Sequence, residues 1–318
     1  ITNTFSSNAL KLAASAIPDE ARGADGSAPT VAQLYDAAVR CARAAGAPLV
    51  AADIGPLGTL LEPMGTLTMD EAYEAFAEQV RAAVTAGADL IIIETMADML
   101  EAKAALLAAK ENSDLPVIAT MTFSAGGRTY LGASATCAAV MLSSMGADIV
   151  GVNCSLGPRE LLSVVREVVA ASRVPVIVQP NAGLPRVEDG QTVYDITVDE
   201  FAAAIDEMLD MGISAVGGCC GTNPDYIRAI RELVDQRGKR GHEIQRPHVD
   251  AFAATSAQEA VVLPLFEASQ AVVGTATDPA ENDDLRESLE AEDYDDLVDE
   301  AYDQQDDDAD IVDIKVSA

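Results

Sequence analysis

Basic residues are scarce in this sequence. Its 318 residues include 20 lysines and arginines against 52 aspartates and glutamates, which gives a formal net charge of −32 at pH 7. Proteins that bind nucleic acids present clusters of Lys and Arg to the phosphates, so this balance argues against a nucleic-acid partner. The excess of acidic side chains is typical of a strongly solvated surface.

Long apolar runs and targeting signals are also missing. No stretch reaches about 18 consecutive apolar residues, so the sequence predicts neither a transmembrane helix nor a membrane partner. The opening segment, ITNTFSSNAL, has no basic part and no apolar part and is unlike a signal peptide. Because the sequence opens without Met and inside a strand-like pattern, we expect that residues of a longer protein precede it.

Cysteine is infrequent as well. The five cysteines are an odd number in a large chain without an export signal. This argues against a disulfide framework and favours a reducing cytoplasm. Cys41 and Cys137 lie within predicted helices, and we interpret them as small apolar residues.

A regular alternation of two patterns extends from residue 47 to residue 220 and beyond. Six continuous apolar runs are typical of strands in a parallel sheet that is buried on both faces; they lie at 48–54, 89–95, 116–123, 148–154, 175–181 and 215–221. Runs of helical period separate and follow them, at 70–86, 98–110, 133–145, 158–171, 198–211 and 223–237. Helix-start signals stand at Thr68, Asp98, Pro158 and Asn223-Pro224. Gly87, Gly146 and Gly212 fit the left-handed position that follows a helix.

This alternation predicts either a doubly wound sheet or a (β/α)8 barrel. No G-x-G-x-x-G follows the first strand, which weakens the dinucleotide-binding version. Polar residues such as Asp53 and Glu94 follow several strands, and in a barrel the strand ends share one chemical face. We therefore predict an α/β fold, a (β/α)8 TIM-type barrel that lacks its first one to two strands. The predicted domains are this barrel at 1–238, a linker at 239–259 and an incomplete, acidic domain at 260–318.

The acidic segment from Glu281 to Asp313 contains a single basic residue, Arg286. Its composition is typical of a disordered tail. Its apolar residues, however, keep roughly helical spacing between Leu285 and Tyr302, and the segment DIVDIKV alternates like a strand. We therefore expect one helix and one strand that begin a further domain.

Three cysteines stand at predicted strand ends. Cys154 ends one strand, and Cys219 and Cys220 end another two β/α units later, so in a barrel all three face the same mouth. Three thiolates suit Zn²⁺ and leave a fourth position open, which is typical of a catalytic zinc site. Adjacent side chains point to opposite faces of a strand, so we expect the glycines of GGCCG (217–221) to let both thiols face one ion.

The alternative is that these thiols are buried apolar groups, but a vicinal pair in a glycine loop with a third strand-end cysteine favours a metal. A thiolate-rich zinc site is suited to binding another thiol and lowering its pKa. The residues alone therefore predict alkyl or methyl transfer to a thiol substrate.

The segments GVNC (151–154) and GGCCGT (217–222) resemble the homocysteine S-methyltransferase family. TNTF (2–5), ADIGPLG (52–58) and IIIETM (91–96) also resemble it, in the expected order, and the likeness covers about residues 1 to 238. The resemblance implies that Cys154, Cys219 and Cys220 hold zinc and activate the thiol of L-homocysteine. It also implies that Glu94 holds the substrate amino group, with Asn153 in the substrate site.

The segment 271–316 resembles, in layout, the start of the pterin-binding barrel that takes methyltetrahydrofolate in cobalamin-dependent methionine synthases. Asp278 and Lys315 stand at the two positions where that barrel has Asn. The resemblance implies a longer protein that transfers a methyl group from methylcobalamin to zinc-bound homocysteine, giving methionine.

Two alternatives stay open. One is a homocysteine methyltransferase that uses S-methylmethionine or another sulfonium donor. The other is a non-catalytic structural zinc module or a decayed fragment.

Overall fold

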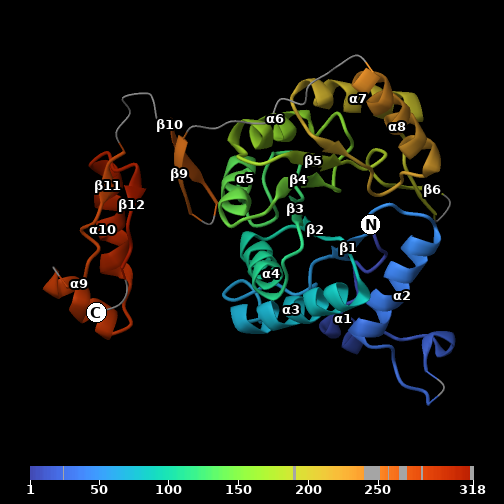
Figure 1. Cartoon of the computed structure of the whole chain (residues 1–318). Coiled ribbons are helices and arrows are strands. Elements are labelled where there is room, and N and C mark those ends of the chain that lie inside the picture. Colours follow the sequence, from blue (N-terminus) through green and yellow to red (C-terminus); the bar gives the residue numbers. More distant parts are fainter. Residues whose placement is uncertain are drawn as a thin grey trace. The chain divides into compact units, whose positions relative to one another are not determined.

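The structure is a computed structural model that describes residues 1–23, 25–188, 191–239, 251–256, 258–264, 271–280 and 282–315. The chain divides into two compact units, whose elements are drawn in Figure 1. The first unit comprises Ile1–Val249 with Ala257–Glu259, and the second comprises Asp250–Ser256 with Ala260–Ala318. None of the helices among the described residues combines the length and apolar composition needed to cross a bilayer.

Six parallel strands form the central sheet of the first unit, hydrogen-bonded in the order β1-β2-β3-β4-β5-β8. Their bounds are β1 Ala51–Ile54, β2 Leu90–Met96, β3 Val117–Met121, β4 Ile149–Asn153, β5 Val176–Gln179 and β8 Ala215–Val216. All six predicted strands are thereby confirmed. A doubly wound sheet reverses its strand order at a switch point, whereas this sheet keeps the order of the chain. The fold is therefore α/β with a six-stranded parallel sheet that is compatible with a TIM-type barrel.

Helices precede and connect these strands (Figure 1). They are α2 Val31–Ala44, α3 Met69–Ala86, α4 Met99–Asn112, α5 Ala135–Ser144, α6 Leu162–Ala171, α7 Val198–Asp210 and α8 Pro224–Lys239. Thr68 caps α3 in a capping box with Glu71. Gly87, Gly146 and Gly212 have positive φ angles of 80°, 95° and 103°, as predicted for residues that follow a helix. The predicted helix start at Pro158 is wrong. Residues 158–161 form a turn, and α6 begins only at Leu162 without a side-chain cap.

The inner face of the sheet changes character along the strands. Near the amino ends it carries an apolar cluster made of Ala51, Ile92, Ile118 and Ile177 with Leu90, Ile149 and Ala215. Since side chains alternate along a strand, the same face carries polar groups nearer the carboxyl ends, namely Asp53, Glu94, Thr120, Asn153 and Gln179. The polar side chains of the inner face are therefore gathered toward the carboxyl end of the sheet.

The residues before β1 lie along its free edge. The Thr2 backbone N–H donates to the Ala51 carbonyl at 2.9 Å, and the Thr2 hydroxyl accepts from the Asp53 N–H at 2.9 Å. Two short helical segments follow, α1 Ala9–Ala14 and the 3-10 helix Asp19–Ala21. The TNTF segment therefore stands in a strand-like position beside the sheet.

An antiparallel hairpin that the sequence analysis did not predict is inserted between β5 and α7. It consists of β6 Arg186–Glu188 and β7 Gln191–Val193. Arg186 and Val187 are exposed and only Val193 is half-buried among its described side chains, so no apolar periodicity marked it in the sequence.

The described residues of the second unit form two small sheets and two helices. Strand β9 Ala251–Thr255 pairs antiparallel with β10 Ala260–Pro264, and β11 Val273–Gly274 pairs parallel with β12 Ile311–Val312. Of the predicted linker 239–259, residues 240–250 lie outside the described residues, whereas 251–255 form β9 because they pair with the apolar segment that follows.

The prediction of a single helix between Leu285 and Tyr302 is wrong. Two helices stand there, α9 Asp283–Glu290 and α10 Asp295–Asp306. The chain turns between them at Glu292, whose φ is 58°, and the Asp293 N–H donates back to the Ser288 carbonyl at 2.9 Å. The expected strand is present but short, and a whole second barrel is not among the described elements.

Candidate metal and substrate site

Three thiols meet at the carboxyl end of the sheet. The sulfur atoms of Cys154, Cys219 and Cys220 all lie within 4.8 Å of one another. The Cys220 sulfur is 3.8 Å from that of Cys154 and 4.0 Å from that of Cys219. A tetrahedral zinc ion with Zn–S bonds of about 2.3 Å holds its sulfur ligands about 3.8 Å apart. The spacing therefore fits one Zn²⁺, and three ligands leave one coordination position open.

The backbone turns that bring the thiols together differ from the expected ones. Only Gly221 of the segment GGCCG has a positive φ, at 79°. A Cβ on Gly217 would lie 3.0 Å from Gln179 Cγ, and one on Gly218 would lie 2.6 Å from the Thr222 hydroxyl. Gly221 therefore supplies a left-handed turn, whereas the first two glycines permit close packing against Gln179 and Thr222.

Cys154 itself adopts the left-handed conformation, with φ of 62°, which turns its side chain out of the strand direction. Its backbone N–H donates to the Gln179 carbonyl at 3.1 Å, so the turn is fastened to the next strand. Asn181 accepts a hydrogen bond from the Cys220 N–H at 3.1 Å and fastens the second loop. Both cysteine loops are thus held by residues at the end of β5.

The three thiols also set one another's protonation. A hydrogen bond from the Cys219 thiol lowers the pKa of Cys154 to about 5, against the effect of burial. The same hydrogen bond raises the pKa of Cys219, its donor, and burial raises that of Cys220. Three thiolates this close need a cation to ionise together, which is the chemistry that a divalent metal supplies.

Asn153 is completely buried and uses its amide group for internal hydrogen bonds. Its Oδ1 accepts from the Thr95 N–H and the Thr120 hydroxyl, both at 2.8 Å. Its Nδ2 donates to the Thr95 hydroxyl at 2.7 Å and approaches the Cys219 sulfur at 3.9 Å. Asn153 therefore ties the end of β2 to the thiol cluster.

Glu94 lies half-buried on the inner face at the end of β2. Thr95, the next residue, has φ of 64°, and the ladder to β3 shifts between Ile93 and Met96. Burial raises the pKa of Glu94, and the negative charge at Cys154 acts in the same direction. The structure thus brings Glu94 into electrostatic reach of the thiol cluster.

Two further buried groups belong to the same face, and sequence reasoning gave them no role. Oδ1 of Asp53 and Oε1 of Gln179 are buried and have no hydrogen-bond partner. Polar residues at the ends of apolar strands were visible in the sequence, but their lack of partners was not. Cys41 is exposed in α2 and Cys137 is buried in α5, so neither thiol belongs to the cluster.

The loop after β1, which contains GPLG, is held from α4. The buried Glu101 carboxylate accepts the Leu57 N–H at 2.7 Å. Burial raises the pKa of Glu101 to about 7, although this hydrogen bond opposes the rise. The loop is therefore fixed at the carboxyl end of the sheet.

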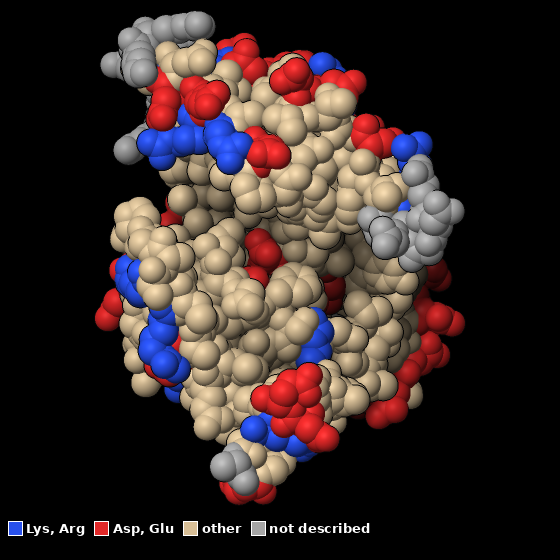
Figure 2. Space-filling model, turned by 90° about the vertical axis from the view of Figure 1, so that its right-hand side faces the viewer, with Lys and Arg blue, Asp and Glu red and all other residues tan. Residues whose placement is uncertain are grey.

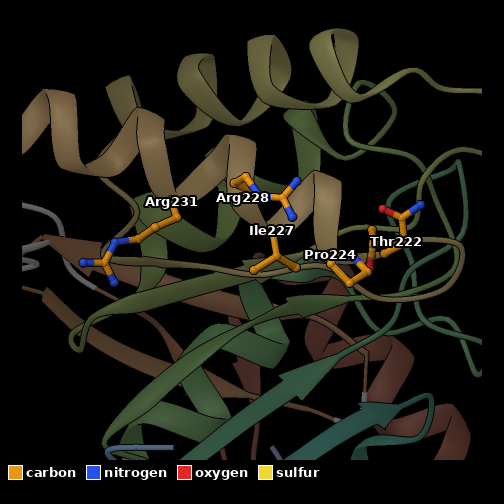
Figure 3. Close-up of a pocket in the computed structure, with 6 residues that line it drawn as sticks. Thr222, Pro224, Ile227, Arg228 and Arg231 are labelled. Atoms are coloured by element: carbon orange, nitrogen blue, oxygen red, sulfur yellow. The ribbon is translucent and has the colours of Figure 1, made fainter. Parts of the chain in front are cut away.

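A separate open pocket of about 610 Å³ lies at the start of α8, directly after the cysteine loop. Figure 3 shows its labelled side chains, with Pro224 and Ile227 on successive turns of the helix. Arg228 pairs with Asp225 at 2.6 Å and Arg231 with Asp235 at 2.9 Å, so both guanidinium groups already have carboxylate partners.

Figure 2 shows a deep hollow in one side of the protein, with acidic side chains in its depth. Most Lys and Arg side chains in this view lie away from the hollow beside acidic neighbours, and one basic group lies at its lower side. An acidic interior favours a ligand that presents a positive charge.

Comparison with known proteins identifies the first unit. The family model described as homocysteine S-methyltransferase matches residues 1–234. Methionine synthase of Mycobacterium tuberculosis (strain ATCC 25618 / H37Rv) is 32% identical over 99% of this chain, and that of Mycobacterium leprae (strain TN) is 33% identical over 80%. The aligned region spans 26% and 22% of these relatives, about a quarter of their length.

The fold is also found among solved structures. The metallated form of the homocysteine methyltransferase MmuM from Escherichia coli superposes with a TM-score of 0.58 and 19% identity, covering 73% of this chain and 78% of that one. With most of the chain matched by the family model and by methionine synthases, the protein belongs to the homocysteine S-methyltransferase family.

Proposed function

We propose that this chain binds zinc through Cys154, Cys219 and Cys220 and transfers a methyl group to the thiol of L-homocysteine, giving methionine. The observation that carries the proposal is the sulfur spacing of 3.8 Å and 4.0 Å, which suits one tetrahedral ion with a free fourth position. When bound, zinc supplies a Lewis acid that lowers the pKa of a substrate thiol.

The chain's own residues orient the substrate. Glu94 receives the substrate ammonium group, because its carboxylate lies on the same face as the cluster and is partly withdrawn from water. Asn153 acts on the substrate through its neighbours, because its hydrogen bonds hold Thr95 beside Glu94 and orient Cys219. The family match and the methionine synthase relatives support this assignment.

The proposed architecture is a (β/α)8 barrel of which this chain forms six strands, followed by the beginning of a pterin-binding-like domain. In a protein of the relatives' length, methylcobalamin would be the methyl donor and methyltetrahydrofolate would restore it. The alignment with methionine synthase extends over 99% of the chain, including the acidic segment, which favours this donor system over a sulfonium compound. The five free thiols support a reducing, cytoplasmic setting.

The test is a methyl-transfer assay on the purified, zinc-loaded chain with L-homocysteine, using methylcobalamin in one arm and S-methylmethionine in the other. Methionine formed from methylcobalamin alone is the expected result. Turnover with S-methylmethionine alone would favour the sulfonium-dependent alternative. Zinc binding without L-homocysteine binding would favour a structural zinc module and overturn the proposal.

A further inference from the structure

Hydrogen bonds hold the backbone of Asp53 firmly, while the Oδ1 atom of its side chain is buried without a partner. Thr2 accepts the Asp53 N–H at 2.9 Å, and Thr4 and Tyr35 donate their hydroxyls to the Asp53 carbonyl at 2.7 Å and 2.8 Å. The side chain lies on the inner face, the residue is 4% exposed, and the buried Oδ1 accepts no hydrogen bond. A buried carboxyl oxygen without a hydrogen-bond partner on a firmly held backbone is unusual, because burying such a group costs free energy.

Asp53 also lies close to Glu94. It pairs with Ile92 in the β1–β2 ladder, and Glu94 follows Ile92 by two residues on the same face. Burial raises the pKa of Asp53 to about 8, and the charge of Glu94 is the second cause. The opposing charges, the amino group of Ile1 and Lys11, act through space, since neither fills the hydrogen-bonding site at Oδ1.

Two carboxyl groups on one buried face call for a cation between them. A primary ammonium group fits because it carries three N–H donors, more than one carboxyl group uses. Resting on the proposed function, we infer that Asp53 is a second substrate-binding residue and that the ammonium group of the amino-acid substrate lies between Glu94 and Asp53. The pair selects thiols that carry an α-amino group over thiols that lack one.

The experiment measures binding of two ligands to the zinc-loaded full chain by isothermal titration calorimetry. One ligand is L-homocysteine, and the other is 4-mercaptobutanoate, which has the same thiol and carboxylate without the amino group. For Asp53→Asn we expect L-homocysteine to bind about tenfold or more weakly, because a charge-assisted hydrogen bond is lost. Binding of 4-mercaptobutanoate and the zinc content should stay as in the unsubstituted chain.

Asp89→Asn is the matched control. Asp89 lies at the opposite end of the sheet, where it accepts the Val50 N–H at 2.6 Å and pairs with Arg43 at 2.7 Å. This substitution should leave the affinities for both ligands unchanged. Asp53→Ser replaces Asp53→Asn if the latter does not give folded protein by circular dichroism.

The outcomes separate this inference from the proposed function. If Asp53→Asn binds L-homocysteine as tightly as the unsubstituted chain does, the role of Asp53 is overturned. It is also overturned if Asp53→Asn loses affinity for L-homocysteine and 4-mercaptobutanoate equally, because that result indicates a structural defect. If Glu94→Gln weakens the binding of L-homocysteine but not of 4-mercaptobutanoate, and Asp53→Asn weakens neither, the proposed function stands and only this inference fails. If the zinc-loaded unsubstituted chain does not bind L-homocysteine, both fail.

Discussion

The two ends of the central sheet carry the same kind of side chain in opposite environments. At the amino end, Asp89 accepts the Val50 N–H at 2.6 Å and pairs with Arg43 at 2.7 Å. These hydrogen bonds lower the pKa of Asp89. At the carboxyl end, Asp53 has a buried oxygen without a partner, and burial raises its pKa to about 8.

The difference supports the proposal that the carboxyl end of the sheet holds the ligand. Asp148 repeats the arrangement of Asp89, since it accepts the Val117 N–H at 2.8 Å and lies 3.5 Å from Lys110. Carboxylates at the amino end thus complete backbone hydrogen bonds at the starts of strands. At the carboxyl end the buried Oδ1 of Asp53 has no such partner, which supports the proposed contact with a ligand, since pKa shifts caused by burial are common at functional sites.

The largest effect should come from the thiol cluster. Replacing Cys154, Cys219 or Cys220 with Ala removes one of three ligands, and we expect zinc content to fall from about one ion per chain to near zero after dialysis against a chelator. Atomic absorption on the purified variants measures it. Cys41→Ala and Cys137→Ala are the controls and should retain zinc, because both thiols lie outside the cluster. Zinc loss from Cys41→Ala with retention in Cys220→Ala would contradict the assignment.

A smaller effect is expected at Glu94. Glu94→Gln preserves the size of the side chain and removes its charge, so homocysteine binding should weaken by about 1.5–3 kcal/mol. Zinc content should not change, because Glu94 is not one of the clustered ligands. Calorimetric titration of L-homocysteine into the zinc-loaded variant is the measurement. An unchanged affinity would remove Glu94 from the substrate site.

Stability against pH compares the two ends of the sheet directly. The pKa of Asp53 rises from 3.8 to about 8 on folding, so its stabilising contribution is present below about pH 4 and is lost as the pH rises through about 8. The free energy of unfolding therefore declines with rising pH by up to about 1.4 kcal/mol per pH unit in this range. Asp53→Asn should flatten the decline and raise the free energy of unfolding near pH 8.

The contribution of Asp89 to stability changes with pH in the opposite direction. Its pKa is lowered in the folded state, so its contribution is present above the ordinary aspartate pKa and is lost as the pH falls. Asp89→Asn should lower stability at neutral pH and reduce the loss on acidification. Urea unfolding of both variants between pH 3 and about 8 tests the pair. If the free energy of unfolding changed with pH in the same way in both variants, the proposed difference between the two ends of the sheet would be wrong.

No measurable effect is expected from methyltetrahydrofolate. In the second unit, Lys315 pairs with Asp278 at 2.6 Å, so the two positions that resemble pterin-binding Asn residues are engaged with each other. The acidic residues from 281 to 313 also repel an anionic folate. Calorimetric titration into the zinc-loaded chain should give no saturable heat, while L-homocysteine serves as the positive control. One-site binding in the micromolar range would show that this unit forms a folate site.

Much of the first unit could be predicted from local pattern. Continuous apolar runs identified all six strands, and glycine identified helix ends such as Gly87, because these signals depend on a few adjacent residues. Convergence of Cys154 with Cys219 and Cys220 was also predictable, since parallel strands end at one edge of a sheet. The acidic segment was harder, because helical spacing alone did not reveal the turn at Glu292.

The sequence by itself determined the order of the six strands of the central sheet, the family and the three clustered thiols. Only the tertiary structure decided how the side chains around them are used. Asn153 hydrogen-bonds Thr95 and Thr120 from other strands, and Asp53 is left without a partner because no neighbouring element supplies one to its buried oxygen. Burial and pairing depend on residues far apart in the chain, so a local pattern shows which polar residues stand at strand ends but not which of them remain available to a ligand.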